Sequence, residues 1–223
     1  MEKSALKLIC IFCLCLLSVT VHAQFMKDAD GRPLFERRYT DVQGSPYLTD
    51  DWQKGAVKFS NGQIHKDVDL KYDQAAEQLI FKGEKGAPLT FIHPVKEFTL
   101  LKNNGTGVIV FRNGYKPVDG AASNTFYQVL TDGETALLKR SFKKIQENKP
   151  YNSATTVKTF VDVNDYYLVK NGSLIKVKRD AKDILPNLTD YTTELQTFIK
   201  KNRLNLKSEA DLILLITYYN SLK

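Results

Sequence analysis

Residues 55–101 decide the fold, and they read GAVKFSNGQIHKDVDLKYDQAAEQLIFKGEKGAPLTFIHPVKEFTLL. Apolar side chains recur here at a spacing of two, first at Val57 and Phe59 and again across 68–72. Successive side chains of a strand point to opposite faces of a sheet, so this spacing indicates strands with one buried face and one wet face. We therefore predict a series of antiparallel strands that continues to the end of 91–101.

Short turn motifs separate the predicted strands. Asn and Gly tolerate the positive φ angles of a tight hairpin turn, so Asn-Gly or Asp-Gly between two strand patterns is a strong hairpin signal. Such pairs occur at 61–62, 113–114, 132–133 and 171–172. Their unequal spacing and dissimilar flanks indicate hairpins rather than sequence repeats. Residues 146–155 are polar and include a proline, and we predict that they form the longest internal loop.

The periodicity changes near residue 180. Asp190 can cap a helix over 191–201, and Ser208 can cap a second helix that starts at Glu209. The second helix carries an apolar stripe too wide to be solvated: Leu212, Ile213, Leu215, Ile216, Tyr219 and Leu222. The sequence therefore predicts an α+β fold, in which a mostly antiparallel, curled or partly closed sheet carries a packed C-terminal helical pair.

The first 23 residues have the composition of a signal peptide. Lys3 and Lys7 precede an apolar run over 8–19, and 21–23 offer small residues at the positions that a signal peptidase reads. We place cleavage before Gln24, which predicts an exported protein, periplasmic or associated with the cell envelope, without a transmembrane segment. An uncleaved anchor is the alternative, although the run is shorter than the roughly 20 residues of a spanning helix.

Cleavage before Gln24 also removes all three cysteines, which lie at positions 10, 13 and 15. We therefore expect no disulfide, thiolate nucleophile or cysteine metal site in the mature chain. That chain is long enough for one substantial core. We predict an irregular N-terminal arm at 24–54, an antiparallel β domain at 55–179 and a helical segment at 180–223, all in one globular unit. The sequence specifies no oligomeric state.

The chain is basic, with a formal net charge of +7; loss of Lys3, Lys7 and Glu2 with the signal would leave +6. Basic residues gather in four short groups, at 139–140, 143–144, 176–179 and 200–203. Solvated faces explain such groups, and so does a surface that attracts anionic polymers of the envelope. Export and the lack of a recognisable binding module argue against nucleic acid as a partner.

A search for chemistry in the sequence nominates no catalytic residue, metal site or cofactor. His65, Asp67 and Asp69 alternate along one predicted strand and offer nitrogen and oxygen ligands, but the wet face of an amphipathic strand explains the same pattern. His93 precedes a proline and is typical of a strand start. The chain contains no Gly-x-Ser-x-Gly elbow and no phosphate-binding loop.

Several short motifs resemble a pattern in uncharacterised exported proteins of Bacteroidota-type bacteria. The resemblance is carried by 44–48, Trp52, 55–57, Gly62 and 68–73. It continues through the paired tyrosines at 166–167 into the C-terminal helical stretch, and so covers most of the mature chain. The resemblance implies an exported, β-rich architecture with a C-terminal helical pair, and it carries no known activity.

The leading functional hypothesis is a non-enzymatic module that binds a protein partner or an anionic envelope polymer. Export, basic charge, aromatic-rich strands and the missing catalytic signature support it. Tyr47, Trp52 and Tyr115 are the candidate residues of a binding surface, although aromatic residues of a lead-in segment also serve packing. Two alternatives stay open: a hydrolase-like enzyme with an acidic pair that the sequence does not identify, and a carrier of an apolar ligand.

Overall fold

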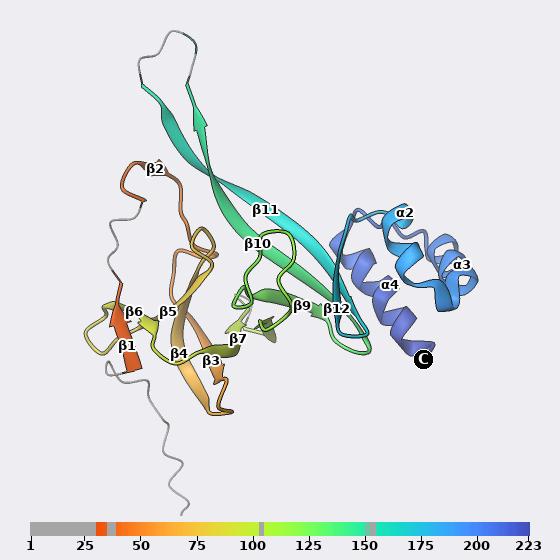
Figure 1. The fold of residues 1–223 in the computed structure, drawn as a ribbon, viewed down its shortest axis with the longest axis horizontal. Helices are drawn as coiled ribbons and strands as arrows, with labels where there is room; N and C mark the ends of the chain where they lie inside the picture. The colour runs from red at the N-terminus through yellow and green to blue at the C-terminus, as the bar shows by residue number, and fades with distance from the viewer. Residues whose placement is uncertain (1–29, 35–38, 103–104, 150, 152–154) are drawn as a thin grey trace, which may run out of the picture.

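The computed structural model describes residues 30–34, 39–102, 105–149, 151 and 155–223. These residues form a twelve-stranded sheet and a C-terminal group of short helices (Figure 1). The strands are β1 (Gly31–Pro33), β2 (Val42–Gln43), β3 (Gln53–Phe59), β4 (Ile64–Asp73), β5 (Gln78–Lys82), β6 (Pro88–Phe91), β7 (Val95–Leu101), β8 (Val108–Arg112), β9 (Tyr127–Thr131), β10 (Thr135–Asn148), β11 (Val157–Lys170) and β12 (Ser173–Val177). The helices are α2 (Ala181–Ile184), η3 (Leu185–Asn187), η4 (Thr189–Tyr191), α3 (Thr192–Asn202) and α4 (Glu209–Ser221).

The sheet is continuous and almost entirely antiparallel. Its spatial order is β1-β6-β5-β4-β3-β7-β8-β9-β10-β11-β12, and the short β2 pairs in parallel with β11. The prediction of an α+β fold with a mostly antiparallel sheet and a C-terminal helical group is confirmed. The strand order has two ends, at β1 and β12, so the sheet does not close on itself.

The strand order departs from a simple meander at one point. Strands β3 to β6 follow one another by hairpins, but β7 returns to pair with the other edge of β3. Pro94 lies between β6 and β7, so the stretch 91–101, predicted as continuous, is divided between two strands. Gly55 permits the close pairing of β3 with β7, because a Cβ there would lie 2.0 Å from the carbonyl oxygen of Thr99.

The Asn-Gly pairs behave in three different ways. Residues 171–172 make the predicted tight turn between β11 and β12, with φ angles of 51° and 72°. Residues 60–62 connect β3 to β4 as a three-residue loop, in which Gly62 alone has a positive φ, of 89°. The prediction of a hairpin turn at 113–114 is wrong, because Asn113 is buried and donates to the carbonyl of Val95 at 2.8 Å while the chain leaves the sheet.

The core is divided along the sheet into clusters. The first covers one face of β3 to β8 and is rich in aromatic rings, with Phe98 stacked on Phe111 at 4.6 Å between centroids. The second joins the helices to one face of β10–β12, and a third, around Leu138 and Tyr167, lies on the opposite face of β10 and β11. Each fully buried apolar side chain contributes roughly 1.5–3 kcal/mol, so the clusters hold the sheet in place.

The C-terminal helices pack on the sheet through α4. Its side chains Leu212, Leu215 and Ile216 are buried in the second cluster. Ser208 caps α4 by accepting from the backbone N–H of Asp211, as the sequence predicts. The prediction that Asp190 caps the helix that follows it is wrong, because its carboxylate accepts from Lys170 of β11 and α3 starts without a side-chain cap.

Strands β10 and β11 form a long hairpin of 14 residues each, paired from Thr135 with Lys170 to Asn148 with Val157. Its far half extends away from the body as a two-stranded ribbon (Figure 1). Residues 146–148 belong to β10, so the prediction of a loop is wrong for them. A ribbon that is wet on both faces lacks the hydrophobic alternation that marks a strand in the sequence.

Parts of the N-terminal predictions lie outside the described residues. The predicted signal peptide and its cysteines belong to this group. Of the predicted irregular arm 24–54, the described part contains β1, β2 and the start of β3. Within the described ranges no helix is both long enough and apolar enough to cross a membrane.

Candidate functional site

Two of the three predicted binding-surface residues meet beside β4. The ammonium of Lys71 lies 4.8 Å from the ring centroid of Tyr47 and 4.9 Å from that of Trp52. Its neighbours Leu70 and Tyr72 belong to the first core cluster, so Lys71 faces the other side of the sheet. Each cation–π contact contributes about 0.5–1 kcal/mol, and together they fasten the lead-in segment to β4. A role of these rings in binding a partner stays a prediction.

Tyr115 lies in a different group of aromatic residues. Its ring meets that of Tyr127 edge-on at 5.4 Å, and Tyr127 meets Tyr167 in the same way at 5.3 Å. Burial raises the pKa of Tyr115, and it raises the pKa of Tyr127 to about 12. The three predicted surface residues therefore fall in two groups, and Tyr115 belongs to the packing of the third cluster.

A partly buried ion pair fixes the long hairpin to the turn between β4 and β5. Arg140 Nε and Nη2 donate to the two carboxylate oxygens of Glu77 at 2.8 and 2.6 Å. The side chain of Arg140 is only 8% exposed. Two parallel hydrogen bonds between planar groups fix orientation as well as distance, so the pair sets how β10 crosses the turn.

Four further hydrogen bonds, all accepted by main-chain carbonyls, continue this attachment at the midpoint of the hairpin. The backbone N–H of Lys143 donates to the carbonyl of Gln74 at 3.1 Å, and the Gln74 amide donates to the carbonyl of Ser141 at 3.3 Å. The ammonium of Lys143 donates to the carbonyls of Ser45 and Tyr47, at 2.8 and 2.9 Å. These bonds hold the hairpin at Lys143, so the part beyond Lys143 is attached to the body of the molecule at that end.

We call residues 144–148 of β10 and 157–162 of β11 the distal ribbon. Ile145 pairs with Phe160, and Lys144 pairs with Val161, so Ile145 and Val161 lie on opposite faces. Their exposed fractions are 46% and 38%. The distal ribbon therefore presents apolar side chains on both of its faces.

The two edges of the distal ribbon differ. Strand β2 pairs with Lys158 and Thr159 on the β11 edge. On the β10 edge, the N–H of Lys143 points away from β11, and alternation along a strand makes the N–H groups of Ile145 and Glu147 point the same way. No described residue hydrogen-bonds to the outward groups of Ile145 or Glu147. Within the described ranges, the β10 edge is therefore unpaired at Ile145 and Glu147.

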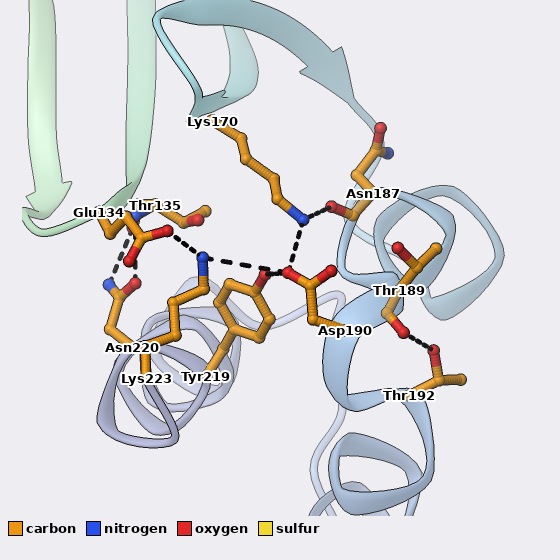
Figure 2. A network of polar contacts seen from close by, with 10 residues as sticks. All are labelled: Glu134, Thr135, Lys170, Asn187, Thr189, Asp190, Thr192, Tyr219, Asn220 and Lys223. Carbon is orange, nitrogen blue, oxygen red and sulfur yellow. Dashed lines mark hydrogen bonds and ion pairs between the residues drawn. The ribbon is translucent and has the colours of Figure 1, made fainter.

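A polar network joins the helices to the ends of β10 and β11 (Figure 2). Asp190 accepts from the Tyr219 hydroxyl at 2.7 Å and from the Lys170 ammonium at 3.0 Å. The next residue of α4 is Asn220, whose amide donates to the carbonyl of Thr135 at 2.8 Å and accepts from its N–H at 3.1 Å. Asn220 thus pairs with the outward side of β10 as a strand would, which closes this end of the edge.

Two carboxyl groups of the helices have lowered pKa values. Hydrogen bonds from Tyr219 and then Lys170 lower the pKa of Asp190. For Glu209, burial acts to raise the pKa, but bonds from Lys139 and Tyr166 outweigh it and the pKa is lowered. Both groups are therefore charged at neutral pH and engaged in holding the helices to the sheet.

The structure separates the three residues weighed as metal ligands. Asp67 has a positive φ of 57° beside a register shift in the β3–β4 pairing, so the regular alternation of the strand is interrupted. His65 lies edge-on to Phe59 at 5.5 Å, whereas Asp69 pairs with Lys54 at 2.9 Å. Across the part of the chain that the structure describes, no group of three or more His, Cys, Asp or Glu residues could hold a metal ion.

The sequence did not predict the free strand edge at Ile145 or the attachment of the hairpin through Gln74. The free edge at Ile145 depends on strand pairing, and the attachment through Gln74 depends on a contact between distant segments. The basic group at 143–144 pointed to this edge only in part. Lys144 is exposed there, but Lys143 is engaged in holding the hairpin.

Comparison with protein-family models, with curated proteins and with solved structures found no match for this chain.

Proposed function

We propose that the chain is an exported, non-enzymatic binding module of the cell envelope, whose partner is a protein that adds an extended segment to the free edge of the distal ribbon. The open row of backbone groups at Ile145 and Glu147 carries this proposal. Strand addition uses such groups, because main-chain hydrogen bonds supply affinity while side chains on alternate positions supply specificity. The signal-like N-terminus supports the export half of the proposal.

The charges along the edge indicate what kind of segment fits. Lys144 and Lys149 are exposed and have no acidic partner among the described residues. Ile145 supplies an apolar contact between them. A complementary segment therefore carries acidic side chains spaced around an apolar one, and opposite charges across paired strands contribute roughly 0.2–1 kcal/mol each.

The same charges limit pairing of this edge with a second copy of the chain. Lysine side chains on an edge strand discourage pairing with a second copy, because like charges come together when two such edges meet. The lysines thus disfavour pairing of this edge with the same edge of a second copy, and they favour pairing with an acidic segment.

Site-specific photo-crosslinking in the native cells tests this proposal. A photoreactive residue at Ile145 samples the edge, and one at Leu214, which is 51% exposed on α4, serves as the matched control. We expect a discrete crosslinked protein from Ile145 and none from Leu214. Equal products at both positions, or none at Ile145, would overturn the proposal.

A further inference from the structure

A second feature is a groove of about 530 Å³ on the β1–β8 part of the sheet, away from the distal ribbon. It lies between β5, β6, the start of β7 and the loops at 113–114 and 123–126. Its floor includes Leu79, Phe91 and Phe126, which also pack in the first core cluster. The volume falls in the range of small-molecule sites.

Polar side chains that make no hydrogen bond within the described part of the chain line the rim of this groove. The ammonium of Lys96 has no ion pair or hydrogen bond among the described residues, and it lies over Gly114, where an added Cβ would come within 2.0 Å of it. The side chains of His93, Ser123 and Asn124 are exposed and likewise make no hydrogen bond among the described residues. The only carboxylate on the lining, Glu77, is held by Arg140. The uncompensated charge of the groove is therefore positive.

We propose that this groove binds a short acidic glycan, with a sugar carboxylate on Lys96. The hydroxyl groups of a sugar match the hydroxyl, amide and imidazole groups of the rim, and its apolar C–H face packs on the floor formed by Phe91 and Phe126. The carboxylate gains a charge-assisted hydrogen bond from Lys96. The net charge of +7 also attracts anions to the surface as a whole.

Two other ligand classes fit the groove less well. An extended peptide needs an unpaired strand edge, but β6 pairs with β5 and β1, and β7 pairs with β3 and β8. A fatty acid needs a closed apolar cavity, whereas this groove is open and its rim is polar. The inference is independent of the proposed protein partner, because none of the groove residues belongs to the distal ribbon.

Calorimetric titration of the purified protein with a galacturonic acid trimer tests the inference, with the neutral galactose trimer as the comparison ligand. Lys96→Ala removes the anchoring charge, and Lys116→Ala, an exposed lysine of the adjacent loop that does not line the groove, gives the same change in net charge. At about 150 mM salt, where general attraction is screened, we expect the acidic trimer to bind and Lys96→Ala to weaken it about tenfold. We expect Lys116→Ala to bind as the unchanged protein does.

Backbone NMR shifts in the same titration locate the ligand, and we expect them at 92–96, 113–114 and 123–126. Three results would overturn the inference: no binding of the acidic trimer, equal binding of the neutral trimer, or equal losses in the two lysine variants. Shifts confined to the helices or the distal ribbon would also overturn it. The crosslinking result at Ile145 has no bearing on any of these outcomes.

Discussion

Arg140 attaches the long hairpin to the turn between β4 and β5. Its guanidinium is buried and makes two hydrogen bonds to Glu77. Arg140→Ala leaves the partly exposed Glu77 carboxylate without its partner, so we expect the free energy of unfolding to fall by about 1–3 kcal/mol. Urea unfolding measures this loss.

A double variant distinguishes the ion pair from simple packing. Arg140→Met together with Glu77→Leu removes both charges and keeps apolar volume, so its loss should be smaller than the sum of the two single losses. Additive losses would contradict a direct pair. Lys144→Ala, an exposed neighbour on the same strand, should change stability by less than about 0.5 kcal/mol.

Asp190 and Glu209 make the attachment of the helices depend on pH. Their pKa values are lowered from 3.8 and 4.5, so both groups add stability at pH values above these figures. That stability is lost as the pH falls through the lower, folded-state values, because the unfolded chain then binds more protons. We expect the unfolding free energy to be level from about pH 7 to pH 5 and to fall below about pH 4.5.

The matched variants Asp190→Asn and Glu209→Gln check this pH dependence by chemical unfolding at a series of pH values. Each should lower stability at pH 7 and flatten the acid limb of the curve. An acid limb of unchanged steepness in both variants would show that other carboxyl groups cause the fall.

At the level of elements, the pairing of β3 with β7 depends on Gly55. A Cβ there meets a backbone carbonyl at 2.0 Å, which has no freedom to move aside without disturbing the sheet. We expect Gly55→Ala to cost about 3 kcal/mol, because overpacking forces backbone shifts. Gly62→Ala should cost about 1–2 kcal/mol, since its φ of 89° is unfavourable for Ala but no atom lies within 4 Å. Thermal and urea unfolding compare the two variants.

The edge of β10 allows a substitution that separates backbone from side-chain recognition. The N–H of Ile145 points away from β11, so Ile145→Pro removes that donor and leaves the β10–β11 hydrogen bonds in place. Ile145→Ala removes most of the side chain and keeps the donor. If a partner adds a strand, the proline variant loses the crosslink from a photoreactive residue at Gln146, while the alanine variant retains part of it. Equal yields in both variants would contradict strand addition.

The sequence predicts those elements whose patterns are local. Alternation identified β3, β4 and β7 because one face of each is buried in the first core cluster. The extension of β10 through 146–148 was missed, because its side chains are wet on both faces and carry no alternation. Asp190 was wrongly predicted as a helix cap because its partner Lys170 is distant in the sequence, where a local pattern does not reveal it.

At the scale of the whole molecule, the binding features depend on pairings between distant segments. Tyr47 and Trp52 were predicted together and do meet at Lys71, because all three lie close to β4. The groove at Lys96 combines five separate segments of the chain, and no local sequence pattern predicts that they meet. The sheet thus carries two candidate binding features, and each depends on strand order rather than on a motif.

The proposed function requires that the distal ribbon is formed in the isolated protein and that its β10 edge is free. Amide-resolved hydrogen exchange tests this directly. We expect slow exchange at Lys144 and Gln146, whose N–H groups face β11, and fast exchange at Ile145 and Glu147, whose N–H groups face outward. Slow exchange at all four amides would contradict the free edge, and fast exchange at all four would contradict the ribbon itself.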